Sequence, residues 1–229
     1  MSAPPDTVVI VSARNEADRL PATLRALAEA FPGAQVVVAD DCSTDETPHI
    51  ALQAGVDLVR SPASVGKGGT ATLAAERMLA RSYEPDPPVF VLCDGDLGTS
   101  AGQLAPLAAA VRDGDCDLAI GAFARRVGGG FGIAVRFAGW AIERRCGLRL
   151  RAPISGQRAL RGELLSVVVP FAPGFGMETA MTIDAVRAGY RLREFDLDLE
   201  HRATGRTLGG FVHRGRQLIA FARVYLGRR

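Results

Sequence analysis

Continuous apolar stretches alternate with helix-like segments through the first half of this 229-residue chain. TVVIVSA (Thr7–Ala13), QVVVAD (Gln35–Asp40) and VFVLCD (Val89–Asp94) are apolar at nearly every position, which is typical of strands buried on both faces. The intervening segment LPATLRALAEA (Leu20–Ala30) has the apolar spacing of a helix. This alternation predicts an α/β fold with a mostly parallel, Rossmann-like central sheet flanked by helices.

Other segments continue the pattern less regularly. We expect a helix from about Pro48 with Thr47 as its N-cap, a strand over Val56–Arg60 and a helix from about Gly69 to Arg81. The later elements are a strand over Cys116–Gly121, a helix through Trp140 to Arg145, a short strand turning into a helix over Ser155–Leu165, a helix over Glu178–Ala188, a strand over Leu192–Leu199 and a terminal helix over Gly209–Tyr225. Without a repeat or linker, residues 1–229 are expected to form a single domain.

Composition places the chain among ordinary globular proteins, with 48% apolar and 23% charged residues. No apolar run approaches the roughly 18–20 residues that span a bilayer, and the N-terminus lacks the features of a signal peptide. The four cysteines are widely spaced and form no C-x-x-C pair. We therefore expect reduced thiols in a cytoplasmic protein.

The cationic residues are unevenly distributed. Lys67 is the only lysine, and arginines crowd the last third of the chain. These are Arg202, Arg206, Arg214, Arg216, Arg223, Arg228 and Arg229. The cluster fits either a phosphate-bearing partner or anionic membrane surface, or a compositional bias with a solvated face.

Polar residues follow three of the predicted strands. They are Ser12, Arg14, Asn15 and Glu16 after the first, Asp40, Asp41 and Ser43 after the second, and Asp94 and Asp96 after the fourth. Ligands of parallel α/β sheets bind beyond the carboxyl ends of the strands, so we expect the three groups to meet along one edge.

The acidic residues suggest a metal and a nucleotide. Asp94 and Asp96 flank Gly95 and could share Mg²⁺ or Mn²⁺ with substrate phosphates, although a solvated turn is the alternative. Lys67, in SVGKGGT ahead of a helix, could meet phosphates together with backbone amides, but the motif is not a Walker A loop. Asp40 and Asp41 could accept the N3–H of a pyrimidine, or they could cap their own turn.

Five ordered motifs together resemble family 2 glycosyltransferases of the GT-A fold. They are VVIVSARNEADRL, VVVADDCSTDET, GKGGTATLAA, CDGDLG and SGQRAL. The second half, with PFAPGFGMETAMTID and HRATGR, is most similar to glucosyl-3-phosphoglycerate synthases, and polyprenyl-phosphate glycosyltransferases are more distant relatives. The resemblance implies a nucleotide-binding half over about 7–97 and an acceptor-side half over about 98–229.

The resemblance also implies a role for each matching residue. The nucleoside would be lined by Ala13, Arg14, Asn15 and Glu16, with Asp40 and Asp41 near the base, and the diphosphate would be contacted by Lys67. The nucleotide sugar would face Asp94 and Gly95, and the donor sugar would lie between Phe175, Gly176 and Met177. The metal would be bound by Asp96 and His201, and Glu178 would be the carboxylate nearest the reacting atoms. Without the resemblance, Glu178 would be interpreted as an acidic residue in the first turn of a helix, and His201 as a surface histidine.

The acceptor side departs from the phosphoglycerate enzymes. Their glycine-rich loop continues as G-R-V-T, where this chain has Gly130-Phe131-Gly132-Ile133. Ala203 stands where those enzymes carry asparagine, two residues past the metal-ligand histidine. An acceptor phosphate would therefore need the arginines Arg125, Arg126, Arg202 or Arg206.

The resulting hypothesis is metal-dependent transfer of a sugar from a nucleotide diphosphate sugar, such as UDP-glucose, to a small phosphorylated or polyprenyl-phosphate acceptor; nucleic acid is not an expected partner. The alternatives are a haloacid-dehalogenase-like phosphatase, for which DGDLGT is one residue out of register, and a non-catalytic nucleotide-sugar binding module. The terminal helix could be a core element, a homodimer contact or an interfacial helix at the inner face of a membrane.

Overall fold

The computed structural model describes residues 5–81, 83, 86–123 and 132–199. Several predicted features lie outside these residues: the metal ligand His201, the acceptor arginines Arg125, Arg126, Arg202 and Arg206, and the terminal helix over Gly209–Tyr225.

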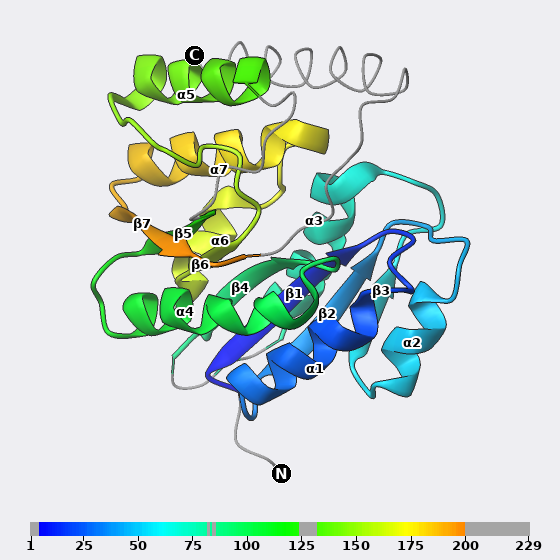
Figure 1. Ribbon diagram of the computed structural model, residues 1–229. Coiled ribbons are helices and arrows are strands. Elements are labelled where there is room, and N and C mark those ends of the chain that lie inside the picture. The colour runs from blue at the N-terminus through cyan, green and yellow to red at the C-terminus, as the bar shows by residue number, and fades with distance from the viewer. Residues whose placement is uncertain (1–4, 82, 84–85, 124–131, 200–229) are drawn as a thin grey trace.

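A seven-stranded sheet forms the centre of the molecule (Figure 1), in the order β3-β2-β1-β4-β6-β5-β7. The strands are β1 (Thr7–Ala13), β2 (Gln35–Asp40), β3 (Asp57–Arg60), β4 (Val89–Asp94), β5 (Leu118–Phe123), β6 (Arg158–Leu160) and β7 (Leu192–Leu197). Among the described strands, β6 alone runs antiparallel to its neighbours, β4 and β5; the other paired strands are parallel. The predicted fold class, a mostly parallel sheet flanked by helices, is confirmed.

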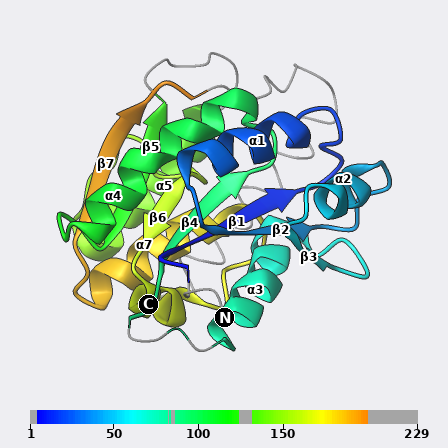
Figure 2. The same ribbon diagram turned by 90° about the horizontal axis from the view of Figure 1, so that it is seen from below.

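Helices cover both faces of the sheet (Figure 2). They are α1 (Leu20–Ala30), α2 (Thr47–Gln53), α3 (Gly66–Leu79), α4 (Ala105–Arg112), α5 (Gly132–Cys146), α6 (Gly162–Val168) and α7 (Met177–Arg187), with the 3₁₀ segments η1 (Gly98–Leu104) and η2 (Gly174–Gly176). Residues of α1, α2, η1 and α4 pack on one face, and residues of α3, α6 and α7 pack on the other.

The apolar pattern of β1 explains this arrangement. Val9 and Val11 enter the core beneath α1 and α4, whereas Val8 and Ile10 enter the core beneath α3. Successive side chains of a strand point to opposite faces, so a strand covered on both faces must be apolar throughout.

The order of the strands reverses direction at β1. From β1 the chain moves to β2 and β3 on one side, and then returns to place β4 on the other side of β1. The carboxyl ends of β1 and β4 therefore flank a topological switch point, where ligands of open α/β sheets bind.

Some boundaries differ from those expected. The helix α3 begins at Gly66, three residues early, so that Lys67 lies in its first turn and not in a loop ahead of it. The N-cap expected for Thr47 is wrong: α2 begins at Thr47 itself, and its hydroxyl accepts the Glu16 N–H instead. The predicted strand Cys116–Gly121 lies two residues later, and η1 and α4 were not anticipated.

The helix α5 lies beyond α7, away from the sheet (Figure 1), where Ile142 packs with Ala180 and Ile183. Among the described residues, no helix has both the length and the apolar content needed to cross a bilayer.

Truncation of a central strand residue should test the importance of this packing. Ile10 is fully buried between β1 and α3. We expect Ile10→Ala to lower the free energy of unfolding by about 2–5 kcal/mol, because it removes buried apolar contacts and leaves a cavity. Leu52→Ala is the control, since Leu52 is 61% exposed; its loss should be within about 0.5 kcal/mol. Urea titration followed by circular dichroism measures both, and equal losses would contradict the packing argument.

Candidate active site

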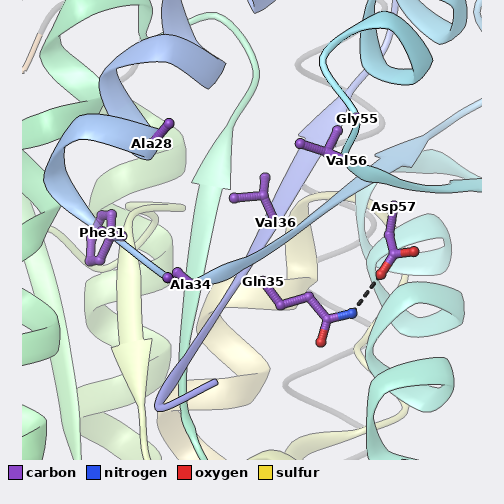
Figure 3. Close-up of a pocket in the computed structure, with 9 residues that line it drawn as sticks. Ala28, Phe31, Ala34, Gln35, Val36, Gly55, Val56 and Asp57 are labelled. Atoms are coloured by element: carbon purple, nitrogen blue, oxygen red, sulfur yellow. Dashed lines mark hydrogen bonds between the residues drawn. The ribbon is translucent and has the colours of Figure 1, made fainter. Parts of the chain in front are cut away.

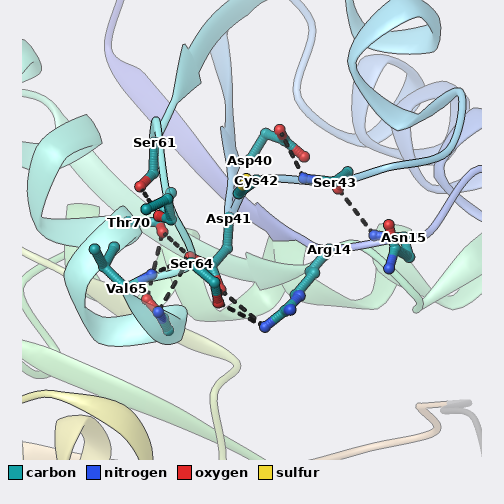
Figure 4. Close-up of polar contacts among 12 residues, drawn as sticks. Arg14, Asn15, Asp40, Asp41, Cys42, Ser43, Ser61, Ser64, Val65 and Thr70 are labelled. Carbon is teal, nitrogen blue, oxygen red and sulfur yellow. Dashed lines mark hydrogen bonds and ion pairs between the residues drawn. The ribbon is translucent and has the colours of Figure 1, made fainter.

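The loops after β1 and β2 lie side by side at the carboxyl edge of the sheet (Figure 4). The Asn15 backbone N–H donates to Ser43 Oγ at 2.9 Å, and Thr44 N donates to Asn15 Oδ1 at 2.9 Å. Asn15 has a φ of 55°, which Asn tolerates better than most residues. The expectation that these two polar groups meet is confirmed.

Asp41 ties these loops to the start of α3 (Figure 4). Its Oδ1 accepts the backbone N–H groups of Val65 at 2.7 Å and of Gly66 at 3.1 Å, and the Thr70 hydroxyl at 3.0 Å. Ser64 Oγ donates to Oδ2 at 2.9 Å. The carboxylate thus caps α3 from outside the helix, which satisfies amides that no intrahelical carbonyl can reach.

The hydrogen bonds to Asp41 affect the pKa of its carboxyl and occupy backbone amides at the start of α3. Burial alone would raise the pKa of the Asp41 carboxyl, but the hydrogen bonds from Ser64, Val65 and Thr70 outweigh it and lower the pKa. Two of the amides that we expected to face phosphates are already bonded to Asp41. Arg14 reaches the same carboxylate at 3.5 Å while its side chain stays 55% exposed.

Asp40 points into the protein. Its side chain is fully buried, and its Oδ2 accepts Arg60 Nε at 3.1 Å and Ser43 N at 3.3 Å. Its Oδ1 has no hydrogen-bond partner among the described residues. Of the two neighbouring aspartates, Asp41 therefore connects loops, whereas Asp40 retains an acceptor without a described partner.

An ammonium and two carboxylates from three different elements meet beside the switch point. Lys67 Nζ, in the first turn of α3, lies 2.6 Å from Asp94 Oδ1 at the end of β4. It also donates to Glu178 Oε1, in the first turn of α7, at 3.1 Å. We refer to Lys67, Asp94 and Glu178 as the acid–lysine cluster. Burial opposes the charge on Lys67, but the two carboxylates outweigh it and raise the pKa of the ammonium far above its usual value.

Close packing brings the first turns of α3 and α7 together. A Cβ at Gly68 would overlap the carbonyl oxygen of Ala172, so α3 approaches this backbone as only glycine allows. The chain then passes through η2, which contains Phe175 and Gly176, to the first residue of α7, Met177. Met177 is 2% exposed and belongs to the core on that face.

Asp96 lies just beyond the cluster. Gly95 N donates to Ser12 O at 2.8 Å, which joins the ends of β1 and β4, and Arg19 donates to the Asp96 carbonyl at 3.1 Å. The described residues contain no group of three or more His, Cys, Asp or Glu side chains that could hold a metal ion by itself. A carboxylate oxygen such as that of Asp96 suits Mg²⁺ or Mn²⁺ when substrate phosphates supply further ligands, so the donor set is compatible with such an ion.

Gln157 is not among the residues that the sequence predicts for the site. Its side chain is 1% exposed, and its Nε2 donates to Asp94 Oδ2 at 2.7 Å. It belongs to SGQRAL, a motif that signalled the family resemblance without indicating a function for this residue.

A shallow depression of about 370 Å³ lies at the opposite end of the sheet, near the amino ends of β2 and β3 (Figure 3). It is lined mainly by small and apolar residues, and its Gln35 and Asp57 side chains bond to each other at 2.5 Å. It therefore offers little chemistry compared with the carboxyl edge.

The capping role of Asp41 predicts a dependence of stability on pH. We expect Asp41→Ala to lower the free energy of unfolding by about 0.5–2 kcal/mol at pH 7, as for loss of a helix cap. Because the pKa of Asp41 is lower in the folded than in the unfolded chain, its contribution is present above about pH 4 and is lost as the pH falls through the folded pKa. The difference from wild type should therefore shrink as the pH falls below about 4. Chemical denaturation at several pH values measures it, with the exposed Asp113→Ala as control; a pH-independent difference would contradict this role.

The chain is similar to known proteins in both sequence and structure. Residues 8–171 match the family model described as glycosyl transferase family 2. The undecaprenyl-phosphate mannosyltransferase of Micrococcus luteus is 30% identical over 228 residues, which cover 90% of this chain and 88% of the relative.

Solved structures of glucosyl-3-phosphoglycerate synthase from Mycobacterium tuberculosis are also similar. The complex with Mn²⁺, UDP-glucose and phosphoglyceric acid has a TM-score of 0.75 and 25% identity, covering 97% of this chain and 80% of the other. The complex with Mg²⁺ and UDP has a TM-score of 0.76 and 26% identity over the same shares.

Both groups of enzymes that the motifs resemble thus occur among the relatives. The family model covers most of the chain, including β1, β4 and the SGQRAL motif, and the sheet matches the GT-A fold of the solved relatives. The chain therefore belongs to glycosyl transferase family 2 and is a glycosyltransferase.

Proposed function

We propose that this enzyme transfers a sugar from a nucleotide diphosphate sugar, with UDP as the nucleotide, to an acceptor that carries a phosphate. The acid–lysine cluster at the switch point is the observation that carries the proposal. It sets one ammonium and two carboxylates beside the edge where a donor would bind.

The donor would lie along the carboxyl edge of the sheet. Ala13, Arg14, Asn15 and Glu16 would line the nucleoside beside Asp41, whereas the fully buried Asp40 would support the loop without touching the base. Lys67, Asp94 and Gly95 would approach the diphosphate and sugar. Gly176 and Phe175 would border the sugar, and the buried Met177 would support them from the core. The contacts between the loops after β1 and β2 support this assignment, because they hold both sides of the nucleoside region together.

The charge of the site supports a requirement for a divalent cation. The three carboxylates of Asp94, Asp96 and Glu178 are balanced by the cations Lys67, Arg19 and the buried Arg158, so the side chains leave no excess positive charge to offset a diphosphate. Asp96 would hold Mg²⁺ or Mn²⁺, and His201 remains the predicted second ligand. When bound, the cation would act as a Lewis acid for the charge that develops on the leaving diphosphate.

The residues of the cluster would have separate tasks. The Lys67 ammonium would neutralise oxygens of the leaving group, since its raised pKa keeps it charged at neutral pH. Asp94 would hold the sugar in place. Glu178, 7% exposed and close to Lys67, would orient the sugar or stabilise positive charge at its anomeric carbon in a site from which water is largely excluded.

The acceptors of the relatives share a phosphate. The name of the Micrococcus luteus enzyme specifies undecaprenyl phosphate, and the Mycobacterium tuberculosis enzyme was crystallised with phosphoglyceric acid. We therefore propose a small phosphorylated or lipid-phosphate acceptor, bound by Arg125, Arg126, Arg202 or Arg206. A lipid acceptor would bring the enzyme to the inner face of the membrane.

Binding of the donor is the first test. Calorimetry should detect UDP and one UDP-sugar in the presence of Mn²⁺, with affinity lost or much reduced without the metal and in Asp96→Ala, because the diphosphate then lacks its counter-charge. GDP and GDP-sugars are the controls for the base. Binding of a GDP-sugar alone would correct the nucleotide, and absence of any nucleotide binding would overturn the proposal.

Turnover tests the role of Glu178. We expect Glu178→Gln to bind the donor but to lose about 10²-fold or more in kcat, because the charge that acts on the sugar is removed. Glu163→Gln is a matched control, since Glu163 is also a first-turn helix acid but has an exposed side chain. Product formation should be measured with 3-phosphoglycerate and with undecaprenyl phosphate in detergent. Normal turnover by Glu178→Gln would show that its carboxylate is only a helix-terminal charge.

A further inference from the structure

Among the described strands, β6 alone is antiparallel to its neighbours, β4 and β5. It therefore begins at the edge of the sheet where those two strands end. Its first residue, Arg158, pairs with Leu92 of β4, two residues before Asp94. The residues just before β6 therefore lie beside the end of β4. A parallel strand at this place would have brought its amino-terminal residues to the far edge instead.

From this position, Gln157 forms two hydrogen bonds with Asp94. Its amide Nε2 donates to Asp94 Oδ2 at 2.7 Å, and its Oε1 accepts the Asp94 backbone N–H at 3.2 Å. Lys67 occupies the other carboxylate oxygen, Oδ1, at 2.6 Å. Each oxygen of Asp94 thus has its own partner, which fixes the plane of the carboxylate as well as its place.

The neighbouring Gly156 lies close against the same ion pair. A Cβ at Gly156 would clash with Lys67 Nζ and would lie 3.0 Å from Asp94 Oδ2. The backbone before β6 therefore packs directly against the ion pair, and a larger residue would push Lys67 and Asp94 apart.

Arg158 holds the backbone that precedes β6 through hydrogen bonds. Although it is fully buried, it forms no ion pair among the described residues; it donates to the carbonyls of Ser155 at 2.8 Å and Pro153 at 3.3 Å. It also donates to Thr182 Oγ1 at 3.0 Å, and Thr182 donates to the Glu178 carbonyl at 2.9 Å. Burial lowers the pKa of Arg158 to about 10, which still leaves it charged at neutral pH.

We infer that Gln157 is a positioning residue for the glycosyl transfer: it holds the Asp94 carboxylate in the orientation in which it meets Lys67 and the donor sugar. The inference rests on the proposed function. Gln157 itself has no described contact with the nucleoside region, so it acts through Asp94. The competing explanation is that Gln157 only satisfies a backbone N–H at the end of β4.

Two substitutions separate these explanations. Gln157→Met removes both hydrogen bonds at similar length, whereas Gln157→Glu keeps an acceptor for the Asp94 N–H but sets a carboxylate against Asp94 Oδ2. If Gln157 orients Asp94, both variants should lose about 10–100-fold in kcat, as when partners of a reactive group are removed. UDP affinity should fall by a smaller factor than kcat, because the bonds of Gln157 reach Asp94 and not the nucleoside region. If Gln157 serves the backbone alone, Gln157→Glu should keep wild-type kcat.

Gln35→Met is the matched control. It also removes a Gln–Asp hydrogen bond between neighbouring parts of the sheet, but at the opposite end (Figure 3). Its kcat and UDP affinity should equal those of wild type, and its thermal midpoint shows how far loss of such a bond destabilises the fold. Wild-type kcat in both Gln157 variants would overturn the inference.

A crystal structure of Gln157→Met provides a readout that does not need turnover. We expect the Asp94 carboxylate to rotate so that it no longer lies within about 4 Å of Lys67 Nζ, the usual limit of an ion pair. An unchanged Lys67–Asp94 contact would overturn the inference even if no substrate were found. Failure of the proposed function would appear differently, as absence of nucleotide binding by the wild-type protein.

Discussion

The contact of Lys67 with Asp94 and Glu178 connects three elements that are far apart in the sequence. Lys67 belongs to α3, Asp94 to β4 and Glu178 to α7, and the nearest two in sequence are separated by most of a helix and a strand. The partly buried ammonium and two carboxylates stabilise one another, because each would lose part of its hydration without a partner of opposite charge. The positions of α3 and α7 are therefore coupled through the site itself.

Around this cluster, the protein uses its polar side chains to fix its loops. Asp41 joins the loop after β2 to the first turn of α3, and so helps to set the place of Lys67 one residue further on. Ser43 and Asn15 join the loops after β2 and β1. The proposed donor region is thus held by hydrogen bonds between loops, while the apolar core on both faces of the sheet holds the strands that carry those loops.

The antiparallel β6 adds a second source of polar residues to the carboxyl edge. In a purely parallel sheet only the residues that follow strands reach this edge, whereas here the residues that precede β6 reach it as well. Gly156, Gln157 and Arg158, at the start of β6, thereby support the acid–lysine cluster. The family motif SGQRAL has a physical basis in this packing.

Much of this architecture is encoded locally. The unbroken apolar runs Thr7–Ala13 and Val89–Asp94 predict buried parallel strands, and the acids that follow them predict the functional edge, because period and polarity are properties of neighbouring residues. Tertiary structure alone decided which partners those residues take. The direction of β6, which brings Gln157 to Asp94, the capping of α3 by Asp41, and the meeting of Glu178 with Lys67 all depend on contacts between residues far apart in sequence. Such contacts follow from strand order and close packing, which the local pattern of residues does not contain.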